Sequence, residues 1–229
     1  MRISELADRT GVSIPVLKLY IREGLLARGA PTSAPQAEYG PEHLDRVNLV
    51  QALRRVQEMP LARIREILDL IDAPPADVVT ATGRAVGALP PYVPQPADLG
   101  DARRVVEHLG MRFAPERPAT AQLQTSIEAL AAAGLPVDAE TLDRYAAPLW
   151  GTAEAELVPM QGMATPDAVA YAVLGTALYE PLILALRRLM HQHLLSPEDA
   201  PSGPDAGGGT DVLAADAAAR ADGGEPERS

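Results

Sequence analysis

The first 72 residues contain an order of short helices and chain breaks that few folds accommodate. Residues 4–9 read as a helix, and Gly11 ends it because glycine adopts turn conformations that a residue with a Cβ atom resists. Ser13 is a good N-cap for a second helix, and Pro15 lies in its first turn, where a missing N–H is tolerated. Gly24 follows that helix at the place of a left-handed C-cap. The pattern predicts two short helices joined by a tight turn.

Two longer helices are predicted to complete this segment. Residues 41–58 and 60–71 both carry apolar side chains at helical spacing. Residues 28–40, rich in proline, glycine and serine, read as a loop between the two pairs. The sequence Ala73-Pro74-Pro75 ends the last helix, because neither proline can continue it. Residues 1–72 are therefore predicted to form one small helical domain.

The remaining sequence predicts a linker, a second helical domain and a tail. Residues 73–97 hold a short helix and a proline-rich linker, and residues 98–196 form the second domain. Its helices are expected at about 98–110, 118–134, 138–162 and 167–195. We expect Pro148 to interrupt the third of these helices and Pro181 to kink or divide the last. The acidic residues 197–229 are rich in glycine, alanine and proline, and are expected to be disordered.

The composition favours an all-α protein. Apolar residues make up 47% of the chain but aromatic residues only 3%, so the core must be mainly Leu, Val, Ile and Ala. The chain has no cysteine, which excludes disulfides, thiolate metal sites and iron–sulfur clusters. Residues 1–20 include Glu5, Asp8 and Arg9 and do not read as a signal peptide. No apolar run is expected to reach the ~20 residues of a membrane helix, so a cytoplasmic protein is predicted.

The net charge of −11 is unevenly distributed along the chain. Residues 1–72 hold ten basic and ten acidic residues, residues 73–198 hold eight and fourteen, and residues 199–229 hold two and seven. Repulsion from phosphate should keep the acidic parts away from a nucleic acid and leave only the neutral first segment able to approach it. The charge permits nucleic-acid binding by residues 1–72 without requiring it.

A helix-turn-helix inserts its second helix into the major groove of double-stranded DNA, with the first residues of that helix nearest the base edges. Here those residues are Ser13, Ile14, Pro15 and Val16. Lys18, the chain's single lysine, follows one turn later and suits a phosphate or a guanine edge. The alternative is that Lys18 is an ordinary solvated residue.

Several motifs together resemble the MerR-type transcriptional regulators. They are the opening ISELADRTGVS, the GLL after the second helix, Tyr39 at the end of the loop, and REILDLI at the end of the fourth helix. The resemblance covers residues 1–72. It implies a winged helix-turn-helix head and a homodimer that regulates promoters by distorting the DNA between the elements that RNA polymerase recognises. RNA polymerase is then an indirect partner at the promoter.

The resemblance also implies particular DNA contacts. Residues 28–40 would be the wing, and Arg54 or Arg55 together with Arg63 would flank the DNA backbone. Lys18-Leu19-Tyr20 stands where the family commonly has Arg-Tyr-Tyr, and Ala37 stands where the wing usually has an arginine, so fewer phosphate contacts are expected. The contacts expected from the resemblance and the helix pattern together are Ser13, Ile14, Pro15, Val16, Lys18, Tyr20, Arg28, Gln36, Tyr39 and Arg54.

The dimer that this resemblance implies must be built differently here. Pro74-Pro75 and Pro90-Pro91 leave about 14 residues, or roughly 20 Å of helix, where the family usually has a long pairing helix. Residues 167–195 are apolar almost all round, and Gly175 and Ala177 would allow close helix approach. Our hypothesis is that this segment supplies the dimer contacts. The alternative is that it is the buried centre of the second domain.

The second domain resembles the helical effector domains of TetR-type regulators in architecture only. Aromatic and methionine side chains gather in it and suit an apolar small-molecule effector, although the same side chains could simply fill a core. These candidate ligand-binding residues are Tyr145, Trp150, Met160, Met163, Tyr171 and Tyr179. His191 and His193 would point about 200° apart on a helix, so neither a metal nor another cofactor is expected.

No arrangement of residues indicates catalysis. The sequence has neither a Ser–His–Asp order in a supporting context nor a glycine-rich phosphate loop, and it has no histidine–carboxylate cluster. An enzyme is therefore not expected. The rival to a ligand-responsive regulator is a ligand-independent or partner-controlled DNA-binding protein whose second domain serves only dimerisation.

Overall fold

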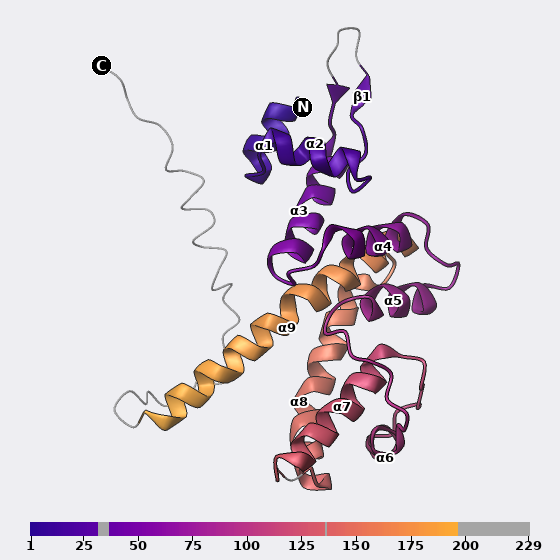
Figure 1. Cartoon of the computed structure of the whole chain (residues 1–229), viewed down its shortest axis with the longest axis vertical. Coiled ribbons are helices and arrows are strands. Elements are labelled where there is room, and N and C mark those ends of the chain that lie inside the picture. The colour runs from indigo at the N-terminus through magenta and orange to yellow at the C-terminus, as the bar shows by residue number, and fades with distance from the viewer. Residues whose placement is uncertain (32–36, 136, 197–229) are drawn as a thin grey trace. The chain divides into compact units, whose positions relative to one another are not determined.

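The computed structural model describes residues 1–31, 37–135 and 137–196, and within these ranges the protein is helical apart from one small hairpin (Figure 1). The prediction of a mainly helical chain is confirmed. The elements are α1 (Ile3–Thr10), α2 (Ile14–Arg22), β1 (Ala30–Pro31), β2 (Ala37–Glu38), α3 (Pro41–Arg55), α4 (Leu61–Asp72), α5 (Val78–Gly87), α6 (Gly100–His108), α7 (Pro118–Ala132), α8 (Ala139–Leu157), the 3₁₀ turn η1 (Val158–Met160) and α9 (Thr165–Leu195).

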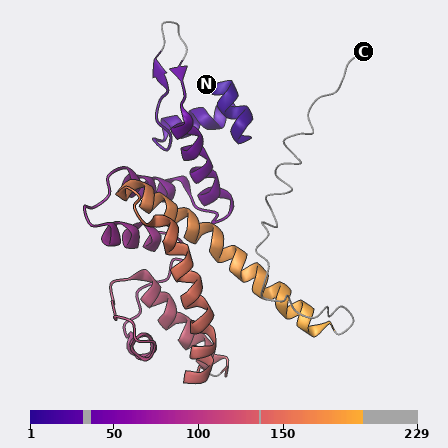
Figure 2. The ribbon, with the colours of Figure 1, turned by 180° about the vertical axis from the view of Figure 1, so that it is seen from behind.

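Helix α8 corrects one prediction, because it continues through Pro148. A proline inside a helix removes one backbone hydrogen bond, but the alanine-rich sequence on both sides favours the helix strongly. The Thr152 hydroxyl donates to the carbonyl oxygen of Pro148 at 2.9 Å, within the turn that follows. Pro181 likewise lies inside one helix, α9, which is drawn as a continuous ribbon in Figure 2.

The first four helices share a closely packed core. Its central side chains come from all four helices and are at most 2% exposed, and α1 packs against both α2 and α3. The largest are Leu6, Leu17, Tyr20, Leu25, Leu53, Ile64, Ile67 and Leu68. Burying each such side chain contributes roughly 1.5–3 kcal/mol. This core fixes the position of α2, the predicted recognition helix.

The same core extends beyond residue 72. Helix α5 contributes Ala81 and Ala85, and α9 contributes Val169, Val173 and Ala177. The three α9 residues are four apart and so lie on one face of the helix. The Gln57 side-chain amide, after α3, also donates to the carbonyl oxygen of Ala177 at 2.6 Å. The first half of α9 therefore packs with the head and not only with its sequence neighbours.

A second, smaller core joins α6 and α7. Gln124 of α7 is 2% exposed, and its side-chain oxygen accepts from the backbone N–H of Ala102 at 2.9 Å. Ala102 lies in the first turn of α6, where backbone donors lack partners within the helix. The Gln124 amide nitrogen contacts Asp101 at 3.2 Å and Glu128 at 2.8 Å. One buried amide thus caps α6 and ties it to α7.

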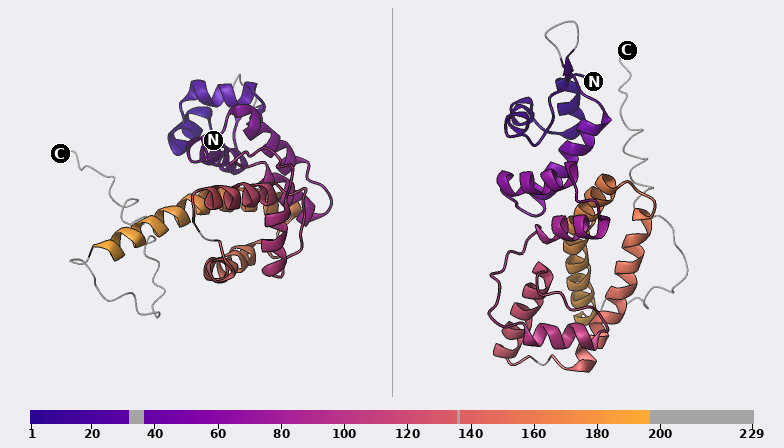
Figure 3. Two further views of the ribbon diagram at one scale, coloured as in Figure 1. Left: turned by 60° about the horizontal axis from the view of Figure 1, so that its bottom comes forward. Right: turned by 90° about the vertical axis from the view of Figure 1, so that its right-hand side faces the viewer.

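Helices α8 and α9, the two long helices in the right-hand view of Figure 3, are much less covered. Helix α8 has no buried residue, and the buried residues of α9 end at Ala177. Residues 1–184 form one compact unit, and α9 continues past it from Ala185. Most apolar side chains of α9 after Ala177 are 40–82% exposed.

Helix α9 also corrects the expectation that no segment is apolar enough for a membrane helix. Its 31 residues contain an 18-residue window of mean hydropathy 1.7, which suffices by length and composition, and 17% of that window is buried. Core helices of soluble proteins meet the same criterion, and Val169, Val173 and Ala177 of α9 pack in the core of the head. The hydropathy of α9 alone therefore does not assign it to a membrane.

Candidate nucleic-acid interface and cavity

Helix α2 begins and ends where the sequence predicts. Gly11 has φ +64°, and Gly24 has φ +73°, so both glycines occupy the left-handed region that ends a helix. Ser13 is the N-cap residue with an extended backbone, although its side chain makes no capping hydrogen bond. The turn and the second helix of a helix-turn-helix are thus both present.

One face of α2 is open to solvent. Pro15, Lys18 and Arg22 are exposed and follow one another at intervals of three and four residues, which places them in one row. Ser13 at the N-cap is exposed as well, whereas Ile14 and Val16 are half-buried. The opposite face carries Leu17 and Tyr20, at 0% and 2% exposed, into the core. Tyr20 packs there, and its role as a DNA contact stays a prediction.

Side chains from α3 and α4 hold the ends of both short helices. The Arg65 guanidinium donates to the carbonyl oxygen of Glu23 at 3.0 Å, at the C-terminus of α2. The Gln51 amide donates to the carbonyl oxygen of Thr10 at 3.1 Å, at the C-terminus of α1. A cation at a helix C-terminus interacts favourably with the helix dipole. Sequence reasoning missed Arg65, whose role depends on a contact 42 residues away along the chain.

The predicted wing is an antiparallel hairpin. Ala30 of β1 pairs with Glu38 of β2, and Pro31 pairs with Ala37. Tyr39 follows β2, and its backbone N–H donates to the Met1 carbonyl oxygen at 2.8 Å, while the N-terminal amine donates to the Tyr39 carbonyl oxygen at 2.8 Å. These two bonds attach the base of the hairpin to the start of the chain.

The Tyr39 side chain is part of the same anchor. It is 6% exposed, and its ring meets that of His43 edge to face, with centroids 5.1 Å apart. The His43 Nδ1 atom accepts from the backbone N–H of Gly40 at 3.0 Å, at the start of α3. Tyr39 therefore holds the hairpin in place, and its contact with DNA stays a prediction.

The cations predicted to contact DNA have different surroundings. Lys18, Arg28 and Arg54 are exposed, and in the described part of the chain they form no ion pair. Arg63 is engaged instead, with Glu66 at 2.7 Å and over the Tyr92 ring at 5.4 Å. Gln36, the remaining wing residue of the prediction, lies outside the described residues.

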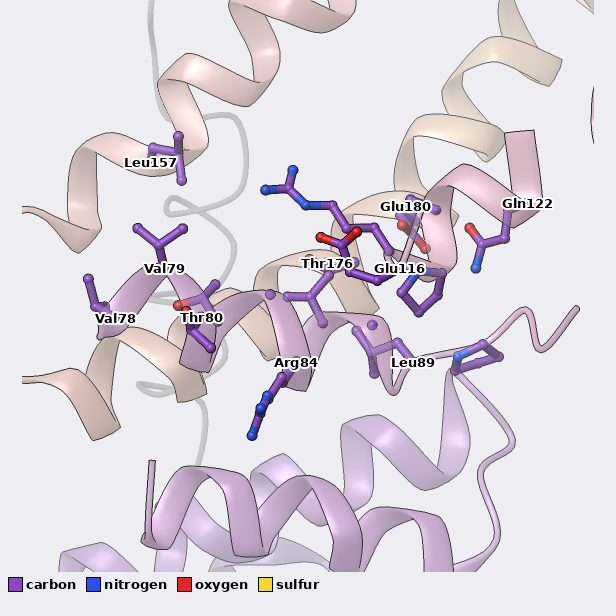
Figure 4. A pocket seen from close by; sticks show the side chains of 18 of the residues that line it. Val78, Val79, Thr80, Arg84, Leu89, Glu116, Gln122, Leu157, Thr176 and Glu180 are labelled. Carbon is purple, nitrogen blue, oxygen red and sulfur yellow. The ribbon is translucent and has the colours of Figure 1, made fainter. Parts of the chain in front are cut away.

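A cavity of about 960 Å³ lies beside α5, within residues 1–184 (Figure 4). Helix α5 forms one wall, and the others come from the start of α7, the end of α8 with η1, and the middle of α9. Ligand pockets for small molecules commonly enclose 300–1,000 Å³. The size of the cavity thus suits a small molecule.

The two ends of the cavity differ in character. Figure 4 shows Val78, Val79 and Leu157 at one end and Glu116, Gln122 and Glu180 at the other, whereas Arg84 points away from the latter end. Partial burial, and to a lesser extent the nearby Glu156 carboxylate, raise the pKa of Glu180 above its ordinary value. Arg117, next to Glu116 in the chain, also belongs to the lining, so the cavity offers an apolar body and a polar end that carries charges of both signs.

Most of the predicted ligand-binding residues do not line this cavity. Met160 does, but Tyr145 and Trp150 are each 52% exposed on α8, and the Trp150 ring nitrogen donates to Glu154 at 3.1 Å. Met163, Tyr171 and Tyr179 are half-buried or exposed and also lie outside the lining. The sequence predicted a short helix between the prolines, but gave no sign that its valines would line a cavity. Across the described residues no group of three or more histidine or acidic side chains could hold a metal ion.

Known proteins with similar sequences and structures support a helix-turn-helix head in this chain. Residues 1–71 match the model of the MerR HTH family regulatory proteins. The chain is also similar to a solved structure, that of the candidate transcriptional regulator SCO5550 from Streptomyces coelicolor A3(2). The identity is 33% and the TM-score 0.64, over 84% of this chain and 94% of that one. None of the curated proteins matches the chain. The likeness therefore extends beyond the head into the C-terminal helices.

Proposed function

Because this chain belongs to the MerR family of DNA-binding transcriptional regulators, we propose that it binds promoter DNA as a homodimer and responds to an apolar small molecule. Residues 1–72 read the DNA, residues 73–97 provide α5 and a linker, and residues 98–196 serve dimerisation and effector binding. The protein acts in the cytoplasm by binding, without a cofactor, and influences RNA polymerase through the shape of the promoter.

The exposed row of α2 carries this proposal. Pro15 and Lys18 face solvent on a helix whose other side is fixed by the core, so the row can enter a major groove without rearrangement. Arg28 and Arg54 are exposed cations of the wing and of α3, and suit the phosphates on either side. The half-buried Ile14 and Val16, and the buried Tyr20 and Tyr39, then act mainly by orienting the residues that touch DNA.

Support for a dimer comes from α9. Leu182, Leu186 and Leu189 are 44–60% exposed, although leucine is ordinarily buried. Such a contiguous apolar surface is unusual on a monomer and typical of an interface. The cavity beside α5 supports an effector site, because α5 is both a cavity wall and part of the core that positions the head.

One feature favours the rival function, a regulator controlled by a protein partner and not by a small molecule. Helix α8 exposes Tyr145, Leu149 and Trp150, each about half accessible, on a surface that would fit a protein partner. A partner-controlled regulator would use this surface and leave the cavity beside α5 without a ligand. The two functions are separated by the effector experiment below.

The DNA-binding proposal is tested by sequencing the genomic fragments that the purified protein retains. We expect two inverted half-sites with fixed spacing, as a two-fold dimer requires. Lys18→Gln should weaken binding and reduce the slope of log affinity against log salt by about 1. The matched control Arg144→Gln, an exposed residue of α8, should leave both quantities unchanged. Retention of unrelated sequences, or an equal effect of both variants, would count against the proposal.

The effector proposal is tested by thermal shift with a panel of apolar compounds. A ligand present at 100 times its Kd should stabilise the protein by about 2.7 kcal/mol. Val79→Trp should abolish the shift by filling the cavity, whereas Val56→Trp, an exposed valine after α3, should retain it. A shift that survives Val79→Trp would place the ligand elsewhere, and no shift from any compound would favour the partner-controlled rival.

A further inference from the structure

Charged residues from two separate segments line the polar end of the cavity beside α5. Glu116 and Arg117 directly precede α7, and Glu180 lies on α9. The ion pairs found in the described part of the chain include none of these three side chains. One guanidinium group and two carboxylates are therefore available to a bound molecule.

The start of α7 has the features of an anion site. Arg117 is the N-cap residue of α7, and its side chain makes no capping hydrogen bond. The next two residues, Pro118 and Ala119, also line the cavity. Backbone N–H groups in the first turn of a helix lack partners within the helix and lie at the positive end of its dipole. The guanidinium group adds a full charge and can hold a carboxylate through two parallel hydrogen bonds.

Arg117 has no competitor for this role among the lining residues. The other arginine of the lining, Arg84, points away from the polar end (Figure 4). The amide nitrogen of Gln122 donates to the carbonyl oxygen of Pro91 at 2.9 Å and is thus already engaged. The lining contains neither lysine nor histidine. Substitution of Arg117 alone should therefore remove the anion site.

The complementary site, for a cation, is at Glu180. Its pKa is raised above the ordinary value by partial burial and, to a lesser extent, by the Glu156 carboxylate, so its charged form lacks a compensating cation. An ammonium group placed against Glu180 would favour the ionised carboxylate. Glu116 lies at the same end of the cavity and adds a second carboxylate (Figure 4). The polar end thus suits a cation beside an anion.

The remainder of the cavity suits an apolar group. Val78, Val79 and Leu157 line it, although they are 40%, 68% and 57% exposed, respectively. Covering such side chains is favourable in proportion to the apolar area that is removed from water. The volume of about 960 Å³ leaves room for a bulky group between these residues and the charged end.

Resting on the effector site of the proposed function, we propose that the effector is an α-amino acid with a bulky apolar side chain. Its carboxylate binds Arg117 and the first turn of α7, and its ammonium group binds Glu180. An α-amino acid carries both charged groups on one carbon atom, which fits a site with both signs at one end. A linear peptide separates its charges by its own length, and an apolar amine or acid satisfies only one side of the polar end.

Three indole compounds test the requirement for both charges. Isothermal titration calorimetry with the full-length protein should show that L-tryptophan binds about tenfold or more tightly than tryptamine, which lacks the carboxylate. L-Tryptophan should exceed indole-3-propionate, which lacks the ammonium group, by a similar factor. L-Phenylalanine and L-leucine extend the series to other apolar side chains. Tryptamine or indole-3-propionate that binds as tightly as every one of these amino acids would overturn the proposal.

Two variants test which residue holds each charge. Arg117→Gln should weaken binding of L-tryptophan about tenfold without weakening that of tryptamine. Glu180→Gln should weaken binding of L-tryptophan and of tryptamine, but not that of indole-3-propionate. The control Arg144→Gln, an exposed residue of α8 outside the lining, should change none of them. An equal loss for all three compounds in both variants would show a general structural effect and overturn the assignment.

Failure of this ligand class can be distinguished from failure of the effector site. Stabilisation by uncharged apolar compounds that Val79→Trp abolishes, together with no binding of the three amino acids, would overturn the amino-acid effector. The apolar effector of the proposed function would then remain. If neither the amino acids nor any apolar compound bound, the effector site itself would be contradicted.

Discussion

Helices α3 and α8 belong to regions of this protein that differ in how far their side chains are buried. Helix α3 has 15 residues and buries five of them, whereas α8 has 19 residues and buries none. The core of the head satisfies its apolar side chains internally, with Leu17, Leu53 and Ile64 all at 0% exposed. The C-terminal helices leave leucines half accessible. The head, whose core includes α5 and the first half of α9, is thus closely packed, whereas α8 and the rest of α9 present surfaces for other molecules.

The largest expected effect is a difference in the free energy of unfolding between alanine substitutions of one leucine from each region. Leu53→Ala in α3 should lower the free energy of unfolding by about 2–5 kcal/mol, because it leaves a cavity in a closed core. Leu149→Ala in α8, where the side chain is 50% exposed, should change it by about 0.5 kcal/mol or less. Urea unfolding followed by circular dichroism measures both. Equal losses would show that α8 is as closely packed as the head.

The next prediction concerns the part of α9 that packs with the head. Val173 is 0% exposed in the core, so Val173→Ala should lower the free energy of unfolding by about 1.5–3 kcal/mol. The loss should appear in the same urea transition as that of Leu53→Ala. If α9 folded apart from the head, hydrogen exchange of the α3 amides would be unaffected by this substitution.

A smaller effect is expected at the end of the recognition helix. Arg65→Gln removes the cation that bonds the Glu23 carbonyl oxygen, which should cost about 0.3–1 kcal/mol of stability. Because this bond holds the C-terminus of α2, affinity for DNA should also fall. The control is Arg104→Gln, since Arg104 pairs with Asp101 within its own helix, α6, and is not among the predicted DNA contacts. Unchanged stability in Arg65→Gln would show that this hydrogen bond does not stabilise the C-terminus of α2.

The smallest effect concerns the cap of α5. The Asp77 carboxylate accepts from the backbone N–H and the hydroxyl of Thr80, and these bonds lower the pKa of Asp77 from its ordinary 3.8. The resulting stabilisation is complete above that value and is lost as the pH falls through the lowered pKa. Asp77→Ala should therefore lower Tm at pH 7, and the difference from the natural chain should shrink in acid. A difference in Tm that stays constant down to pH 2 would show that the ionised Asp77 carboxylate is not the source of the stabilisation.

Most of the head could be predicted from the sequence, and much of the site could not. Gly11, Ser13 and Gly24 act through local backbone preferences, so the ends of α2 were predictable from the residues themselves. The contact between Arg65 and Glu23 depends on tertiary packing, which no local pattern reports. Tyr20 likewise has the polar group of a binding residue but a nearly inaccessible position.

The cavity was missed for the same physical reason. Its main wall, α5, is a short helix between prolines, and short helices gain their stability from packing and not from propensity. The aromatic residues Tyr145 and Trp150 cluster along the sequence, but α8 directs them to solvent. Clustering in sequence thus pointed to α8 and α9, whereas the cavity is lined mainly by α5 and by the start of α7, and the predicted ligand contacts stay a prediction.

The claim that the C-terminal helices are completed by a second copy is tested most directly by the mass of the full-length protein in solution. Sedimentation velocity over a range of concentrations should show a species of twice the 24.2 kDa chain mass, which Leu184→Glu converts to single chains. Leu149→Glu, at a similarly exposed leucine of α8, should remain a dimer. A natural chain that sediments at 24.2 kDa at every concentration would contradict the account.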